Sequence, residues 1–120
     1  MAEKQLGDYS IGHLRSKYLD LASISFAQEK YTIAKGYIDA FLETIDETKP
    51  AGKTIKKEFD IIHTRKKQQL KELESSVENM GYLEQRDITN EGHESIEINS
   101  IHDMKMICWK VAMGEGLFNE

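Results

Sequence analysis

The spacing of apolar residues over the first 46 positions is the feature that most restricts how this chain can fold. Between residues 10 and 29 the apolar side chains follow a three-four spacing, which winds one stripe down an α-helix. A broader apolar face continues at the same period between residues 31 and 45. Because the interruption at residues 28–30 is short, we expect two neighbouring helices folded into an antiparallel hairpin over residues 10–46.

The only proline in the chain separates this hairpin from a long helix. Residues 47–53 contain Pro50 and a glycine, and the residue before a proline disfavours helical geometry, so we expect a loop here. Thr54 is suited to cap the helix that follows. The apolar positions after it fall on one side, which predicts a long helix over residues 54–80, with Gly81 ending it in a left-handed turn.

The helical period is lost between residues 82 and 99. Residues 96–98 alternate briefly behind the turn-like segment 90–92, so we expect an irregular segment or a short β-hairpin at about 83–98. Ser100 and Asp103 resemble a capping box, which predicts a C-terminal helix and tail over residues 100–120. The whole pattern predicts an all-α chain forming one helical domain over residues 1–120.

Length and composition agree with one globular domain and exclude several classes of protein. A chain of 120 residues with 39% hydrophobic and 31% charged residues fits a globular fold rather than a disordered segment. Cys108 is the only cysteine, which excludes an internal disulfide framework and favours a reducing compartment. No apolar run approaches the roughly 18 residues that span a bilayer. We therefore expect a cytoplasmic protein, or a virion component if the chain is phage-encoded, without a membrane partner.

Part of the first hairpin resembles a known repeat. In residues 18–45, Leu21 and Ala22 stand where the tetratricopeptide (TPR) family has its Leu-Gly pair, Tyr31 opens the second helix, and Ala34 is the small residue where the helices touch. This span is therefore similar to a single TPR-like helix pair, although Phe41 replaces the family's alanine and no second copy follows. The resemblance implies protein recognition rather than catalysis.

The sequence offers no catalytic site, metal site or cofactor site. His93, His102 and Asp103 are the only cluster of metal-ligand residue types, but their spacing places no two ligands on one helical face, so we expect no bound metal. Cys108 lies on the apolar stripe of the last helix, which favours a buried side chain over a nucleophile. Glycine-rich phosphate loops and nucleotide fingerprints are also missing. We therefore predict that the chain is not an enzyme.

A basic island interrupts an otherwise acidic chain. The net charge is -5, yet residues 53–71 hold seven basic and two acidic side chains. A row of amines on one helix can bind phosphates. It can equally be a solvated or internally paired surface, since Asp60 lies within it and stacking aromatics are missing. The candidate nucleic-acid-binding residues, which we call the lysine stripe, are Lys53, Lys56, Lys57, Lys67 and Lys71.

The C-terminal segment is the preferred partner-binding surface at the level of sequence. Trp109 falls opposite the inner face of the last helix, and Leu117 and Phe118 follow two glycines, so this tail either folds back on the core or inserts into a partner. We expect the outward arrangement. The sequence thus favours a non-enzymatic adaptor or assembly subunit that binds a protein partner or itself, such as a phage or virion accessory protein. The alternative is a nucleic-acid-associated regulator that uses the lysine stripe.

Overall fold

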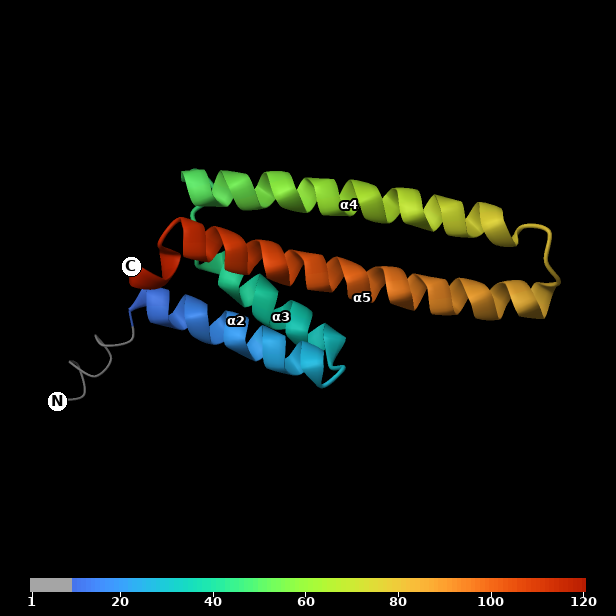
Figure 1. Cartoon of the computed structure of the whole chain (residues 1–120), viewed down its shortest axis with the longest axis horizontal. Coiled ribbons are helices and arrows are strands. Elements are labelled where there is room, and N and C mark those ends of the chain that lie inside the picture. Colours follow the sequence, from blue (N-terminus) through green and yellow to red (C-terminus); the bar gives the residue numbers. More distant parts are fainter. Residues whose placement is uncertain (1–9) are drawn as a thin grey trace.

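The computed structural model describes residues 10–120 as an all-helical chain (Figure 1). None of these residues lies in a β-strand, which confirms the all-α prediction. The elements of this part are α2 (Ile11–Ala27), α3 (Tyr31–Glu43), α4 (Pro50–Val77), α5 (Tyr82–Gly114) and a 3-10 turn, η1 (Leu117–Asn119).

The first two helices form the expected antiparallel hairpin. The hydroxyl of Ser10 accepts a hydrogen bond from the backbone N–H of His13 at 3.2 Å, which caps α2. The connection to α3 is a tight turn in which Glu29 takes a positive φ of 61° and the N–H of Lys30 bonds to the carbonyl of Ser25. The hairpin over residues 10–46 is therefore confirmed.

The boundaries of α4 differ from the sequence-based ones at both ends. Proline 50 is the first helical residue rather than a loop residue, because its fixed φ suits the first turn and its missing N–H is not needed there. The helix ends at Val77. Gly81 has φ -62° and ψ 153°, so the expected left-handed turn is wrong, and this residue instead caps the start of α5.

The expected irregular segment or β-hairpin at 83–98 is wrong, because residues 82–114 form one continuous helix. The turn-like pattern at residues 90–92, which led to this prediction, came partly from Gly92. A Cβ at this glycine would lie 2.6 Å from the Leu73 side chain, so the glycine lets α5 approach α4 closely inside a helix. Ser100, the expected cap, lies buried in the middle of α5.

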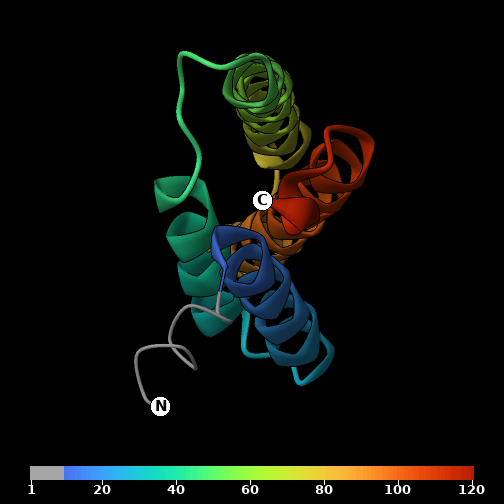
Figure 2. The same ribbon diagram turned by 90° about the vertical axis from the view of Figure 1, so that its left-hand side faces the viewer.

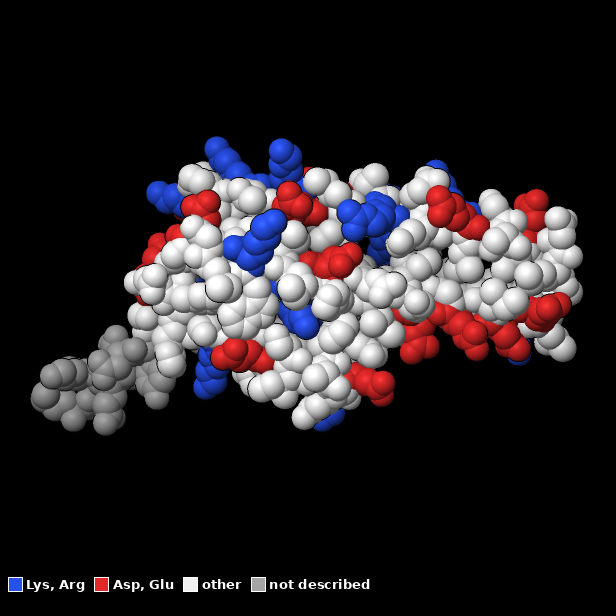
Figure 3. All heavy atoms as spheres, in the orientation of Figure 1, with Lys and Arg blue, Asp and Glu red and all other residues white. Residues whose placement is uncertain are grey.

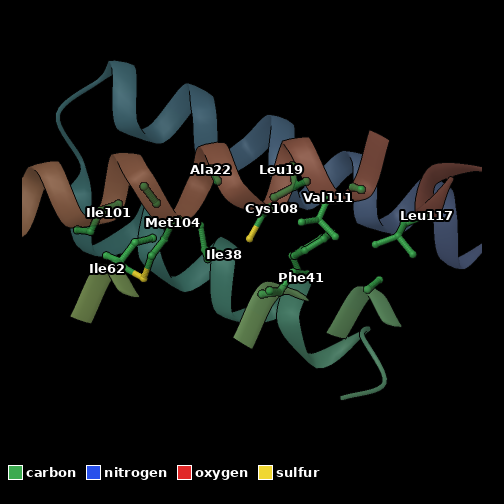
Figure 4. Packing of buried hydrophobic residues seen from close by; sticks show 14 residues of the cluster. Leu19, Ala22, Ile38, Phe41, Ile62, Ile101, Met104, Cys108, Val111 and Leu117 are labelled. Carbon is green, nitrogen blue, oxygen red and sulfur yellow. The ribbon is translucent and has the colours of Figure 1, made fainter. Parts of the chain in front are cut away.

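The hydrophobic core joins α2, α3, α4 and α5 (Figure 4). Helix α5 is the central element, since it contacts α2, α3, α4 and η1. Its residues Met104 and Cys108 point into the space between the α2–α3 hairpin and α4. The most deeply buried side chains of this core include Leu19, Ile38, Phe41 and Cys108.

The molecule is elongated because α4 and α5 extend beyond the first hairpin (Figure 1). Its extents are 66 × 29 × 17 Å and its radius of gyration is 18.0 Å. A compact domain of this length would have a radius of gyration of roughly 13–14 Å. We call residues 67–96, where α4 and α5 pack only on each other, the arm, and the rest of the described chain the base. An ion pair between Lys66 and Glu97 lies where the two meet.

Candidate functional site

The C-terminal segment folds back onto the base. The indole N–H of Trp109 donates to the hydroxyl of Ser23 at 3.2 Å, and its ring lies edge-on to Phe118 with centroids 5.4 Å apart. Leu117 is buried in the core. The expected outward arrangement of Trp109, Leu117 and Phe118 is therefore wrong. Of the two alternatives that the sequence left open, the structure shows the tail covering the core.

A buried arginine that the sequence gave no reason to select holds this tail in place. Arg15 is 7% exposed, and its guanidinium donates to Thr44 Oγ1 at 3.1 Å, to the Thr44 carbonyl at 2.8 Å and to the Leu117 carbonyl at 3.1 Å. It also forms an ion pair with Glu120. One side chain thus links α2, the end of α3 and the C-terminal turn.

The other residues that the sequence considered for chemistry, Cys108, His102 and Asp103, lie in surroundings typical of structural residues. Burial, together with the nearby charge of Asp39, raises the pKa of the Cys108 thiol to about 12, so this thiol stays protonated at neutral pH. The His102 ring packs on Phe26 with centroids 5.5 Å apart, and Asp103 lies 3.5 Å from Arg65 in an ion pair. Within residues 10–120, no group of three or more ligand residues is placed to hold a metal ion.

The lysine stripe lies on the exposed outer side of α4 (Figure 3). Arg65 and Lys66, which belong to the same basic island, are paired with Asp103 and Glu97 of α5. In contrast, none of the five stripe lysines forms an ion pair with any described residue. The island therefore divides into an internally paired edge and a free row of amines.

An opposite charge lies on the other edge of the arm. Figure 3 shows acidic side chains along the edge of α5 toward the tip, on the side away from the stripe. The exposed carboxylates here are Glu84, Asp87, Glu91 and Glu94. Glu74 and Glu78, also exposed, continue the acidic character at the end of α4. The arm is thus polarised across its width, with the amines of Lys67 and Lys71 on α4 and a row of carboxylates along the opposite edge, on α5.

The end of the arm exposes three apolar side chains, which we call the tip. Tyr82 is 77% exposed, Leu83 is 64% exposed and Met80 is 38% exposed. They lie together at the connection between α4 and α5, at the far end of the molecule (Figure 1). The sequence placed Met80 inside a helix and gave the other two no role, since a tip is recognisable only once 82–114 is known to be helical.

A second apolar surface lies between the end of α3, the segment that follows it and the start of α4, which Figure 2 shows on one side of the molecule, joined by the connecting loop. This groove has a volume of about 200 Å³. Its apolar lining comes from both walls, and its rim carries Glu47, Lys56, Asp60 and His63. The apolar lining residues are Leu42, Ile45, Ile55 and Phe59.

Comparison of the chain with protein-family models, curated proteins and solved structures finds no match. The resemblance of residues 18–45 to a TPR-like helix pair therefore stays a prediction. Separately, none of the helices described between residues 10 and 120 is both long and apolar enough to cross a lipid bilayer.

Proposed function

We propose that this chain is a non-enzymatic protein-interaction module, serving as an adaptor or assembly subunit, and that the arm is its contact element. The observation that carries the proposal is the tip, where Tyr82 and Leu83 are more exposed than buried at the end of a projecting helix pair. Exposed apolar side chains that cluster at one place mark contact sites more often than singly scattered ones do. Tyrosine is also enriched among the residues that carry binding energy at interfaces.

The base supports this assignment because Trp109, Leu117 and Phe118, which the sequence offered as partner-binding residues, already pack within the chain. Leu117 is buried, and Trp109 has its indole N–H satisfied by Ser23. The protonated, buried thiol of Cys108 gives no support to nucleophilic chemistry. An interaction role for the arm agrees with these features.

The test compares tagged wild-type protein with the tip variant Tyr82→Ser/Leu83→Ser by chemical cross-linking and pull-down in the native host. We expect the tip variant to lose the protein associations of the wild type while keeping its helical circular dichroism. The matched control is Met106→Ser/Met113→Ser, which removes apolar side chains that are 51% and 70% exposed on the base. Equal association by the tip variant and the wild type would refute the proposal.

A nucleic-acid-associated regulator is the second candidate function. It is favoured by the five unpaired amines of the lysine stripe, which lie on one side of one helix. Neutralising phosphates with these amines would make the affinity fall steeply with salt. A titration of DNA and RNA binding against salt, with Lys67→Gln/Lys71→Gln as the variant, tests it directly.

A further inference from the structure

The amines of the lysine stripe form two clusters with a gap between them. At the helical period, all five stripe lysines fall within one sector of about 100° on α4. Lys57 and Lys67 border the gap, and they are separated by roughly 15 Å of helix at 1.5 Å per residue. Asp60 and Thr64 are exposed in the same sector inside the gap. The positive charge is therefore divided between the two ends of one helical span.

These amines are available to an anionic ligand. None of them forms an ion pair with a described residue, and the carboxylates of α5 lie along the opposite edge of the arm (Figure 3). On α4 itself the exposed Glu74 and Glu78 follow Lys71, so the basic surface ends there. An anionic ligand on this surface would therefore lie across α4 rather than follow the helix toward the tip.

The gap has the dimension of a groove in a DNA duplex. The major groove of B-form DNA is about 12 Å wide and is bordered on both sides by a row of phosphates. A helix lying across this groove would place one lysine cluster over each row, because each ammonium group is carried on a flexible four-carbon stem. Asp60 would then lie between the two rows, over the opening of the groove. This position accounts for a carboxylate in the middle of a basic surface.

Single-stranded nucleic acid fits the same surface less well. Proteins that bind single strands without sequence preference combine amines with aromatic side chains on which the bases stack. Phe59 is the only phenylalanine, tyrosine or tryptophan between positions 53 and 71, and it packs against the hydrophobic core. The lysine stripe therefore offers contacts to phosphates and no stacking surface for unpaired bases.

We infer that the outer side of α4 binds double-stranded DNA, with the helix across the major groove and one lysine cluster on each row of phosphates. Contacts of this kind hold the duplex without reading its sequence. This inference goes beyond the protein-interaction function and rests on the second candidate function, for which it names the ligand. The clusters are Lys53, Lys56 and Lys57 at one end, and Lys67 and Lys71 at the other.

Fluorescence anisotropy with a labelled DNA duplex of arbitrary sequence, two helical turns long, tests the inference. We expect the wild type to bind this duplex about ten times more tightly than either separated strand. The logarithm of the affinity should fall with the logarithm of the salt concentration with a slope of roughly -4 to -5, as five neutralised phosphates require. Lys53→Gln/Lys57→Gln and Lys67→Gln/Lys71→Gln should each raise the dissociation constant about tenfold and reduce this slope by about 2.

A charge-conserving variant separates the two-cluster geometry from the total charge. Thr64→Lys/Lys71→Gln keeps the number of amines but moves one of them from the end of the span into the gap. It should bind the duplex as weakly as Lys71→Gln alone, because the moved amine lies over the groove rather than over a row of phosphates. The control Lys17→Gln/Lys110→Gln removes two exposed lysines outside α4 and should leave the affinity unchanged.

Several results would overturn the inference. One is a wild-type chain that does not bind the duplex even at low salt. Another is binding of single strands, or of vesicles of anionic phospholipid, that is as tight as binding of the duplex. A third is wild-type affinity for Thr64→Lys/Lys71→Gln. If single strands alone are bound, this inference fails and the second candidate function stands. If no nucleic acid is bound and the tip variant still loses its host partners, the protein-interaction function alone stands.

Discussion

The base and the arm share the two long helices, α4 and α5, but differ in how those helices are covered. In the base, α5 packs against α2, α3, α4 and η1, and side chains such as Leu19 and Phe41 are 0% exposed. In the arm each helix has one neighbour, and Val77 is the only buried residue between positions 67 and 96. Coverage on several sides supplies stability, whereas coverage on one side leaves a long surface for contacts. The base should therefore carry the folding free energy and the arm the interactions.

The largest expected effect is on the free energy of unfolding, and it compares a buried residue of the base with a buried residue of the arm. Phe41→Ala in the base should lower the free energy of unfolding by about 3–5 kcal/mol, because it opens a cavity in a site with no exposed surface. Val77→Ala in the arm should cost about 1–2 kcal/mol, since it removes a smaller side chain. Urea denaturation monitored by circular dichroism measures both. A larger loss of stability for Val77→Ala than for Phe41→Ala would contradict the view that the base carries the folding free energy.

The hydrogen bonds of Arg15 in the base give the next largest effect. Arg15→Met should destabilise the chain by about 2–3 kcal/mol, since it leaves the carbonyl groups of Thr44 and Leu117 without their donor. The ion pair with Glu120 adds little, because that carboxylate is 56% exposed. Lys17→Met, an exposed position on the same helix, is the control and should change stability by less than about 0.5 kcal/mol. Equal effects of the two changes on stability would show that the hydrogen bonds of Arg15 do not stabilise the base.

Two glycine-to-alanine changes sharpen the contrast in packing. A Cβ at Gly12 would lie 2.3 Å from the carbonyl oxygen of Phe118, and backbone atoms cannot move aside easily, so Gly12→Ala should cost about 1–3 kcal/mol. A Cβ at Gly92 meets only the flexible end of Leu73. There the gain in helix propensity, up to about 1 kcal/mol, offsets the crowding, so Gly92→Ala should be close to neutral. Thermal unfolding of both variants decides whether the arm tolerates what the base does not.

The pH dependence of stability provides a smaller, site-specific test of the base. The pKa of Cys108 is raised from 9.0 to about 12 in the folded chain, so above pH 9 the unfolded chain releases a proton that the folded chain keeps. Stability should therefore fall as pH rises through this window, by up to about 1.4 kcal/mol per pH unit from this group. Cys108→Ala removes the contribution. Parallel pH profiles of the two proteins would show that the thiol is not buried as described.

The sequence predicted the α2–α3 hairpin correctly because its apolar residues recur over wide faces. The α2–α3 hairpin has several neighbours, so its apolar residues recur often enough to reveal the period. The arm could not be predicted in the same way. A helix with one neighbour needs only a narrow apolar stripe, and Gly92, which serves a close helix crossing, has the composition of a turn. The weak period at 82–99 was therefore mistaken for irregular structure.

The candidate sites could also be predicted only in part. The sequence correctly placed the lysine stripe on one helix, but it left open whether the amines are solvated or paired within the chain, and the structure shows them exposed. The tail was not, because Trp109 faces away from the inner face of α5 yet meets Ser23 of α2. Helical periodicity within one element cannot reveal a second element that covers its far side. The tip and the groove could not be predicted for the same reason, because their positions depend on where the helices end and on which elements lie beside them.

Amide hydrogen exchange measured across a range of protein concentrations tests the central claim, that the arm is the contact element, most directly. At low concentration, amides around residues 78–88 should exchange faster than those of α3, because fewer neighbours hold them. As protein concentration rises or host protein is added, protection should increase around 78–88, while the amides of α3 stay unchanged. Exchange at the tip that is independent of both concentration and added host protein would contradict the account.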